Sequence, residues 1–220
     1  MKYIIATILV VLILLTLPNK STKMNTLLPH DTILAFGDSI TYGHGAGYDE
    51  SYPAHLSSLT GHKVINAGIN GETSNEGLQR LPKLLEDKSI KLMILCFGGN
   101  DILRRQSMDT LKNNLKTMIH MAKAKEIDVL LVAVPNISLF GISPLELYEE
   151  VAQEEDIPLL SGVLADILSD PALKNDQIHP NALGYKQMAE KIYESLVENG
   201  SIKETESLLP NGGGKAFRFR

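Results

Sequence analysis

Uninterrupted apolar runs constrain the fold of this 220-residue chain more than any other feature. Residues 91–97 read Lys-Leu-Met-Ile-Leu-Cys-Phe, and residues 128–134 read Asp-Val-Leu-Leu-Val-Ala-Val. Neither run alternates apolar and polar residues, as a strand with one face in water would. Short runs of this kind are typical of strands in a parallel sheet that is covered on both faces. The chain therefore needs helices on both sides of a sheet.

Segments with strand-like and helix-like patterns alternate along the rest of the chain. Further strands are expected at residues 32–36, 63–66 and 157–160, and helices at residues 52–59, 75–85, 109–125, 144–154 and 181–199. The helix at 109–125 shows the clearest periodicity, with one apolar face made by Leu111, Leu115, Met118, Ile119 and Ala122. This alternation predicts an α/β fold, a three-layer α/β/α sandwich around a mainly parallel, five-stranded sheet of the flavodoxin-like kind.

The two ends of the chain differ in composition from the middle. Lys2 precedes an apolar run at residues 3–17, which is short for a membrane span and typical of a signal peptide. Because no small-x-small cleavage site follows, an uncleaved N-terminal anchor is the alternative. We therefore expect an exported protein of the periplasm or cell envelope, with a linker at residues 18–30, one domain at 31–200 and a disordered tail at 201–220.

Charge and cysteine content exclude several classes of function. A formal net charge of −5 gives no basic field for nucleic acid. Cys96 is the only cysteine, so no internal disulfide forms, and its place in an apolar run predicts a buried structural thiol. No cysteine-rich zinc motif is present. We expect a monomer that acts on a small molecule without a metal or organic cofactor.

Four short segments carry residues suited to acyl transfer. They read Gly37-Asp38-Ser39-Ile40-Thr41, Asn70-Gly71-Glu72-Thr73-Ser74, Gly98-Gly99-Asn100-Asp101 and Asp176-Gln177-Ile178-His179-Pro180. They supply a serine, a glycine N–H, a side-chain amide and an Asp/His pair, which is what a serine nucleophile needs. Three of the segments follow predicted strands, where open α/β sheets place their sites.

These segments resemble the SGNH (GDSL-type) hydrolases over residues 32–197. The run Asn66-Ala67-Gly68-Ile69-Asn70-Gly71-Glu72-Thr73-Ser74 is similar to a bacterial branch of thioesterases, lysophospholipases and arylesterases. The resemblance implies Ser39 as nucleophile, His179 as base and Asp176 as the group that orients it. It also implies that the Ser39 N–H, the Gly71 N–H and the Asn100 amide bind the oxyanion.

Substrate contacts are less constrained by the sequence. His44, five residues after Ser39, is a rival base, but we interpret it as lining the substrate entrance. Ile102 and Arg104 follow one strand, and Arg104 could meet an anionic leaving group or face solvent. Ile137, Leu139 and Phe140 follow the next strand. They could line an acyl groove or pack at the edge of the core.

The predicted activity is hydrolysis of carboxylic esters and acyl thioesters, with lysophospholipids as further substrates. A carbohydrate O-deacetylase is the alternative enzyme, since the same catalytic set suits it. A catalytically silent acyl-binding protein is the alternative outside enzymes.

Overall fold

The computed structural model describes residues 23–138, 141–143 and 145–203. The predicted signal or anchor segment at residues 3–17 lies outside the described residues, as does the tail beyond residue 203. Within the part of the chain that is described, no helix is long and apolar enough to cross a membrane.

Five parallel strands form the central sheet in the order β2-β1-β3-β4-β7, which confirms the predicted sheet. Their bounds are β1 Thr32–Gly37, β2 Lys63–Gly68, β3 Ile90–Cys96, β4 Asp128–Val132 and β7 Leu159–Leu160. The inner strands β1 and β3 are almost entirely buried, whereas the edge strand β2 is only partly covered. Continuous apolar sequence thus marks the strands that helices cover on both faces.

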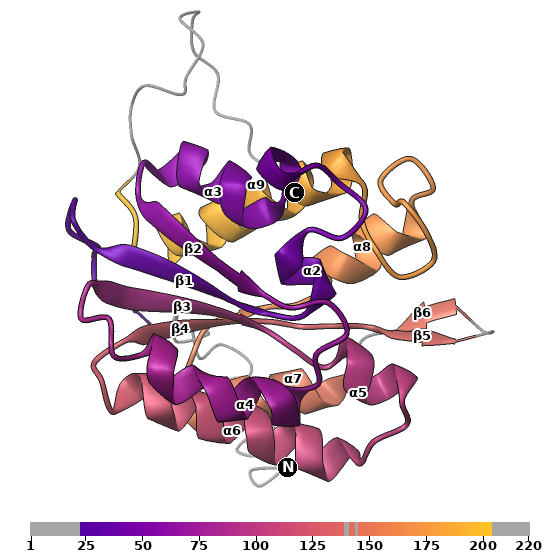
Figure 1. Cartoon of the computed structure of the whole chain (residues 1–220), viewed down its shortest axis with the longest axis horizontal. Helices are drawn as coiled ribbons and strands as arrows, with labels where there is room; N and C mark the ends of the chain where they lie inside the picture. Colours follow the sequence, from indigo (N-terminus) through magenta and orange to yellow (C-terminus); the bar gives the residue numbers. More distant parts are fainter. Residues whose placement is uncertain (1–22, 139–140, 144, 204–220) are drawn as a thin grey trace, which may run out of the picture.

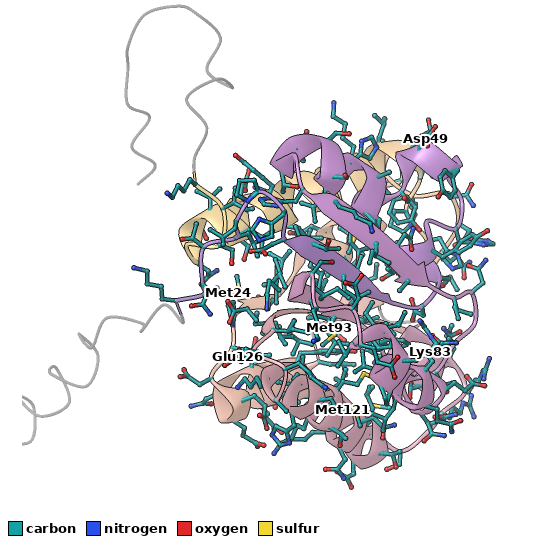
Figure 2. All side chains as sticks on the ribbon, turned by 60° about the vertical axis from the view of Figure 1, so that its left-hand side comes forward. Met24, Asp49, Lys83, Met93, Met121 and Glu126 are labelled. Carbon is teal, nitrogen blue, oxygen red and sulfur yellow. The ribbon has the colours of Figure 1, made fainter. Side chains whose placement is uncertain are left out.

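Helices cover both faces of the sheet, which makes the three-layer sandwich (Figure 1). One face carries α3 (Tyr52–Thr60) and α9 (Ala182–Glu198), and the other carries α4 (Ser74–Leu84), α6 (Met108–Lys123) and α7 (Glu146–Glu155). The apolar face predicted for α6 is buried at all five positions. Figure 2 shows Met93 of β3 inside the packed side chains, with Lys83 and Glu126 at the periphery. Cys96 is fully buried, as expected of a structural thiol.

Short elements cluster at the carboxyl ends of the strands (Figure 1). The helix α2 (Ser39–Tyr42) follows β1, α5 (Gly99–Leu103) follows β3, and α8 (Val163–Ser169) follows β7. After β4 comes a hairpin of β5 (Asn136–Ser138) and β6 (Gly141–Ser143), and η1 (Tyr48–Glu50) is a single 3₁₀ turn. The sequence analysis did not predict these elements, since each is too short to show a period.

The domain boundaries differ from those predicted. Met24 and Leu27, in the expected linker, are buried in the core, and their N–H groups bond to the carbonyls of Asn199 and Ser201. Ile202, in the expected tail, is also buried. The prediction of a linker up to residue 30 and a tail from residue 201 is therefore wrong at these positions, because the two segments pack together.

Candidate active site

Ser39 is the first residue of α2, directly beyond the end of β1. Asp38 caps this helix, with its carboxylate accepting the Ile40 N–H at 3.0 Å. Gly37 makes the turn possible, because a Cβ there would lie 2.2 Å from Thr41 Oγ1 and 2.4 Å from the Cys96 carbonyl oxygen. Only glycine lets the chain pass this close to β3 before it enters α2.

Ser39 is joined to His179 and Asp176 by a chain of hydrogen bonds across 140 residues of sequence. Ser39 Oγ lies 3.0 Å from His179 Nε2, and His179 Nδ1 lies 2.9 Å from Asp176 Oδ2. An ionised carboxylate can only accept a hydrogen bond, so Nδ1 carries the proton. Nε2 is then left to accept the bond from the Ser39 hydroxyl. This is the arrangement that activates a serine.

A tight local turn holds Asp176 against His179. Asp176 Oδ1 accepts the N–H groups of Ile178 at 2.8 Å and His179 at 2.9 Å. Partial burial acts to raise the pKa of the Asp176 carboxyl, but the bonds from Ile178 and His179 outweigh it and lower the pKa below its usual value. The carboxyl is therefore ionised at neutral pH and can stabilise a positive charge on His179.

Two further candidate donors, Gly71 and Asn100, line the cavity beside Ser39. Gly71 occupies a turn closed by a bond from the Glu72 N–H to the Ile69 carbonyl, with a φ of 77° that favours glycine. Asn100, in α5, donates from Nδ2 to the Glu72 carbonyl at 3.0 Å and, more weakly, to Asp38 Oδ2 at 3.4 Å. Ser39, Gly71 and Asn100 line the same cavity. Three residues that carry N–H donors therefore border one cavity, as an oxyanion site requires.

Buried ionic and polar side chains fix the Gly71 segment. The carboxylate of Glu72 is 8% exposed and accepts Arg80 Nε at 2.7 Å. The same guanidinium lies 4.5 Å from the centre of the Phe36 ring and bonds to the Ala67 carbonyl. The Gly71 segment is thus tied directly to β1 and β2.

A second anchor joins this segment to the helices. The fully buried Asp101 accepts the Ser74 N–H at 2.9 Å and the Ser74 hydroxyl at 2.6 Å. Asn114 of α6 then donates to the Ser74 oxygen at 2.9 Å. Asp101 therefore has a structural role.

Asp38 has an unusual protonation equilibrium. Burial raises the pKa of its carboxyl to about 7, against the opposing effect of the Ile40 N–H. The carboxylates of Asp101 and Glu72 raise this pKa further, and the Asn100 amide lowers it. Because Asp38 Oδ2 accepts a hydrogen bond from the Asn100 amide, a change in the charge of Asp38 changes the strength of that bond.

The cavity beside Ser39 measures about 220 Å³ and is mainly apolar. Its apolar wall comes from α2, α5, the segment after β4, α8 and the loop before His179, through Ile40, Ile102, Leu103, Val134, Pro135, Leu164, Leu168 and Ile178. Such a wall suits a hydrocarbon chain, since burial of apolar surface is its main source of affinity.

The structure brings together most of the residues that the sequence singled out. His44 and Ile102 line the cavity, and the His44 ring centre lies 4.3 Å from that of His179. Arg104 instead donates to the Gly71 carbonyl at 2.7 Å and lies 3.7 Å from the Glu76 carboxylate. Leu139, Phe140 and the side chain of Ile137 lie outside the described residues, so their predicted role in a groove stays a prediction.

Sequence reasoning missed the contribution of α8. Leu164 and Leu168, one helical turn apart, line the cavity although each is almost fully buried. A leucine pair at this spacing does mark a helical face. The sequence carried no signal that this face turns toward Ser39.

One group near the cavity has the composition of a metal site. His44, Asp176 and His179 each offer one ligand atom, and these atoms all lie within 4.8 Å of one another. Two imidazoles and a carboxylate are a ligand set that Zn²⁺ accepts.

Comparisons with known proteins give the family. The sequence model of the GDSL-like lipase/acylhydrolase family matches residues 35–187. Thioesterase 1/protease 1/lysophospholipase L1 of Escherichia coli (strain K12) is 32% identical over 158 residues, which cover 69% of this chain and 76% of that protein. An arylesterase of Vibrio mimicus is 27% identical over 179 residues, covering 77% of this chain and 90% of that protein.

Solved structures agree with this assignment. The crystal structure of TesA matches with a TM-score of 0.71 at 30% identity, covering 77% of this chain and 99% of that chain. The fold, the matched family region and the relatives all point to one conclusion. The chain belongs to the GDSL-like lipase/acylhydrolase family and is an ester hydrolase.

Proposed function

We propose that the protein hydrolyses carboxylic esters and acyl thioesters through an acyl-enzyme on Ser39. One observation carries the proposal: the hydrogen-bonded chain from Ser39 Oγ through His179 to Asp176 opens onto an apolar cavity. Gly71 and Asn100 line the same cavity. The site therefore combines an activated nucleophile, oxyanion donors and room for an acyl group.

In the first half of the reaction, Ser39 Oγ attacks the carbonyl carbon while His179 Nε2 takes the hydroxyl proton. The negative charge that forms on the substrate oxygen is bound by the N–H groups of Ser39 and Gly71 and by the Asn100 amide. His179 then gives its proton to the leaving alcohol or thiol as the bond to the carbonyl carbon breaks. The ionised Asp176 stabilises the imidazolium in between.

In the second half, a water molecule replaces the leaving group. His179 takes a proton from this water as its oxygen attacks the acyl carbon, and the same donors bind the second oxyanion. The bond to Ser39 Oγ then breaks, and His179 returns the proton to the serine. The products are a free acid and the regenerated enzyme.

The cavity wall favours an acyl chain longer than acetyl. An acetyl group would leave the side chains from α5 and α8 without apolar contact, whereas a longer chain would cover them. The names of the E. coli relative, a thioesterase and lysophospholipase, fit such substrates. This argument places the carbohydrate O-deacetylase second, since its acyl group is only an acetyl.

Leu103 offers a way to test the role of the cavity. Its side chain is 56% exposed and lines the cavity, so replacing it should not disturb the core. Leu103→Ser should lower kcat/KM for long-chain chromogenic esters by about three- to tenfold, and leave the acetyl ester nearly unchanged. Leu183→Ser is the matched control, because Leu183 is 62% exposed on α9 and does not line the cavity.

The decisive comparison is a series of esters and thioesters of rising acyl length beside an acetylated sugar. We expect kcat/KM to rise from acetyl toward longer chains. Preference for the acetylated sugar would support the deacetylase instead. Tight acyl binding without turnover would support a catalytically silent binding protein.

A further inference from the structure

The side chain of His44 is not needed for the proposed acyl transfer, yet it lies directly against the base. Its ring centre is 4.3 Å from that of His179, and its carbonyl accepts the hydroxyl of the fully buried Tyr185 at 2.8 Å. This bond ties the loop that carries His44 to α9. The backbone of His44 is therefore fixed at a place from which its ring reaches the ring of His179.

The three side chains together have the chemistry of a zinc site. Their ligand atoms lie within 4.8 Å of one another. In a tetrahedral site with bonds of about 2.0–2.2 Å, two ligand atoms lie about 3.4 Å apart, so closure needs the ligand atoms to approach one another by no more than about 1.4 Å. His44 is exposed and the Asp176 side chain is 41% exposed, so an ion can reach them from solvent.

The two oxygens of the Asp176 carboxylate are not held equally. Its Oδ1 accepts two backbone N–H groups and lies 3.1 Å from His179 Nδ1, whereas Oδ2 has one bond within the described part of the chain, to His179 Nδ1 at 2.9 Å. An ion that replaced the contacts with the His179 ring would leave the two backbone bonds to Oδ1, and with them the turn at residues 176–179, intact. The local backbone therefore keeps the carboxylate in place for a metal.

We propose that Zn²⁺ binds reversibly to His44, Asp176 and His179 and inhibits the enzyme. This inference rests on the proposed function, because inhibition requires His179 to be the base. Zn²⁺ at His179 Nε2 would displace the Ser39 hydroxyl. Zn²⁺ between Nδ1 and the Asp176 carboxylate would take the place of the Nδ1 proton and leave the ring proton on Nε2. In either case the lone pair that must accept the serine proton is lost.

His44 supplies the third zinc ligand, which an Asp/His pair alone does not have. Asp176 and His179 alone offer two ligands, which are too few for tight zinc binding. Loss of even an indirect partner of a zinc ligand costs about 10- to 100-fold in metal affinity. Removing His44, a direct ligand, should therefore weaken zinc binding by at least about tenfold.

Calorimetric titration of Ser39→Ala with Zn²⁺ tests the site without any need for turnover. This variant keeps all three ligands, so we expect one zinc ion per chain. The same titration with Ser39→Ala/His44→Ala and Ser39→Ala/His44→Gln should show the loss of affinity. Ser39→Ala/His30→Ala is the control, because the His30 side chain is 79% exposed and lies beside the start of β1, away from Ser39.

Turnover of a chromogenic ester supplies the second readout. Zn²⁺ should inhibit the otherwise unchanged protein, EDTA should restore the rate, and Mg²⁺, which prefers oxygen ligands, should have little effect. Unchanged zinc affinity in both His44 variants, or no stoichiometric binding to Ser39→Ala, would overturn the proposal. If the esters are not hydrolysed at all, the proposed function fails, while the calorimetric result still stands alone.

Discussion

The two sides of the site are built differently. On one side, Gly71 and Asn100 are held by the buried carboxylates of Glu72 and Asp101 and by the partly buried Arg80, which connect them to β1, β2 and α4. On the other side, Asp176 and His179 lie in a loop, and the Asp176 side chain is 41% exposed and held mainly by its own turn. We call these the oxyanion side and the base side.

The difference matches what each side is proposed to do. Donors to an oxyanion stabilise the transition state only if they are already aimed at it, which favours rigid, buried support. A base must exchange protons with serine, leaving group and water, which requires access to solvent. We therefore expect substitutions on the oxyanion side to affect stability as well as turnover, and those on the base side to affect mainly turnover.

Asp176→Ala should give the largest effect, a fall in kcat of about 10⁴-fold, because His179 would lose the group that fixes its tautomer. The free energy of unfolding should change by no more than about 1 kcal/mol, since the side chain is partly exposed. Steady-state kinetics and urea unfolding measure both quantities. A large loss of stability would remove the contrast between the two sides.

Asn100→Ala should lower kcat by about 10²–10³-fold with little change in KM, the usual cost of one oxyanion donor. The amide binds the charged tetrahedral oxygen more strongly than the neutral carbonyl, so its loss appears in kcat. The assay is the one used for Asp176→Ala. A kcat near that of the unchanged protein would mean that Asn100 is not a donor.

Arg80→Ala should destabilise the fold by about 3 kcal/mol, because it leaves the buried Glu72 carboxylate without its partner. Lys191→Ala is the matched control. Its ion pair with Glu194 is about half exposed, so its loss should cost no more than about 1 kcal/mol. Equal unfolding midpoints in urea for the two variants would contradict the structural role of the Glu72–Arg80 pair.

Stability should fall as pH rises from 5 to 8 because of Asp38. Its pKa is raised from 3.8 to about 7, so the folded state binds more protons than the unfolded state between these values. The expected loss is about 3 kcal/mol. Asp176 has the opposite effect on stability. Its pKa is lowered from 3.8 in the folded state, so the stability that it contributes is lost as the pH falls below about 4. Urea unfolding of Asp38→Asn should show a flatter profile from pH 5 to 8, and an unchanged slope would refute this assignment.

His44→Ala should have the smallest effect on kcat in the absence of zinc, since His44 lines the entrance and is not part of the hydrogen-bonded chain. Kinetics in EDTA measure this effect. A collapse of kcat comparable to that of Asp176→Ala would make His44 the base in place of His179.

The sequence predicted the sheet and the base side better than the support of the oxyanion side. Buried strands such as β3 can be recognised in the sequence as continuous apolar runs. Asp176 and His179 are only three residues apart, so one turn can join them. The Glu72–Arg80 pair and the Asp101–Ser74 bond could not be predicted, because they join residues 8 and 27 positions apart without any periodic pattern.

The short helices that shape the cavity were also missed. The helix α5 begins at Gly99, a residue that weakens helix propensity, and α8 is only seven residues long. What orients Leu164 and Leu168 toward the cavity is packing against the rest of the fold. The roles of Ser39, Gly71 and Asn100 came from family resemblance, since the segments that carry them meet only after folding.

The central claim is that Ser39 is the nucleophile, and covalent labelling tests it most directly. The protein should be treated with a fluorophosphonate, which forms a bond to an activated serine, and the modified peptide identified by mass spectrometry. We predict one adduct per chain, located on Ser39, which is absent from Ser39→Ala and strongly slowed in His179→Ala. An adduct on a different serine, or labelling of Ser39→Ala at the rate of the unchanged protein, would contradict the account.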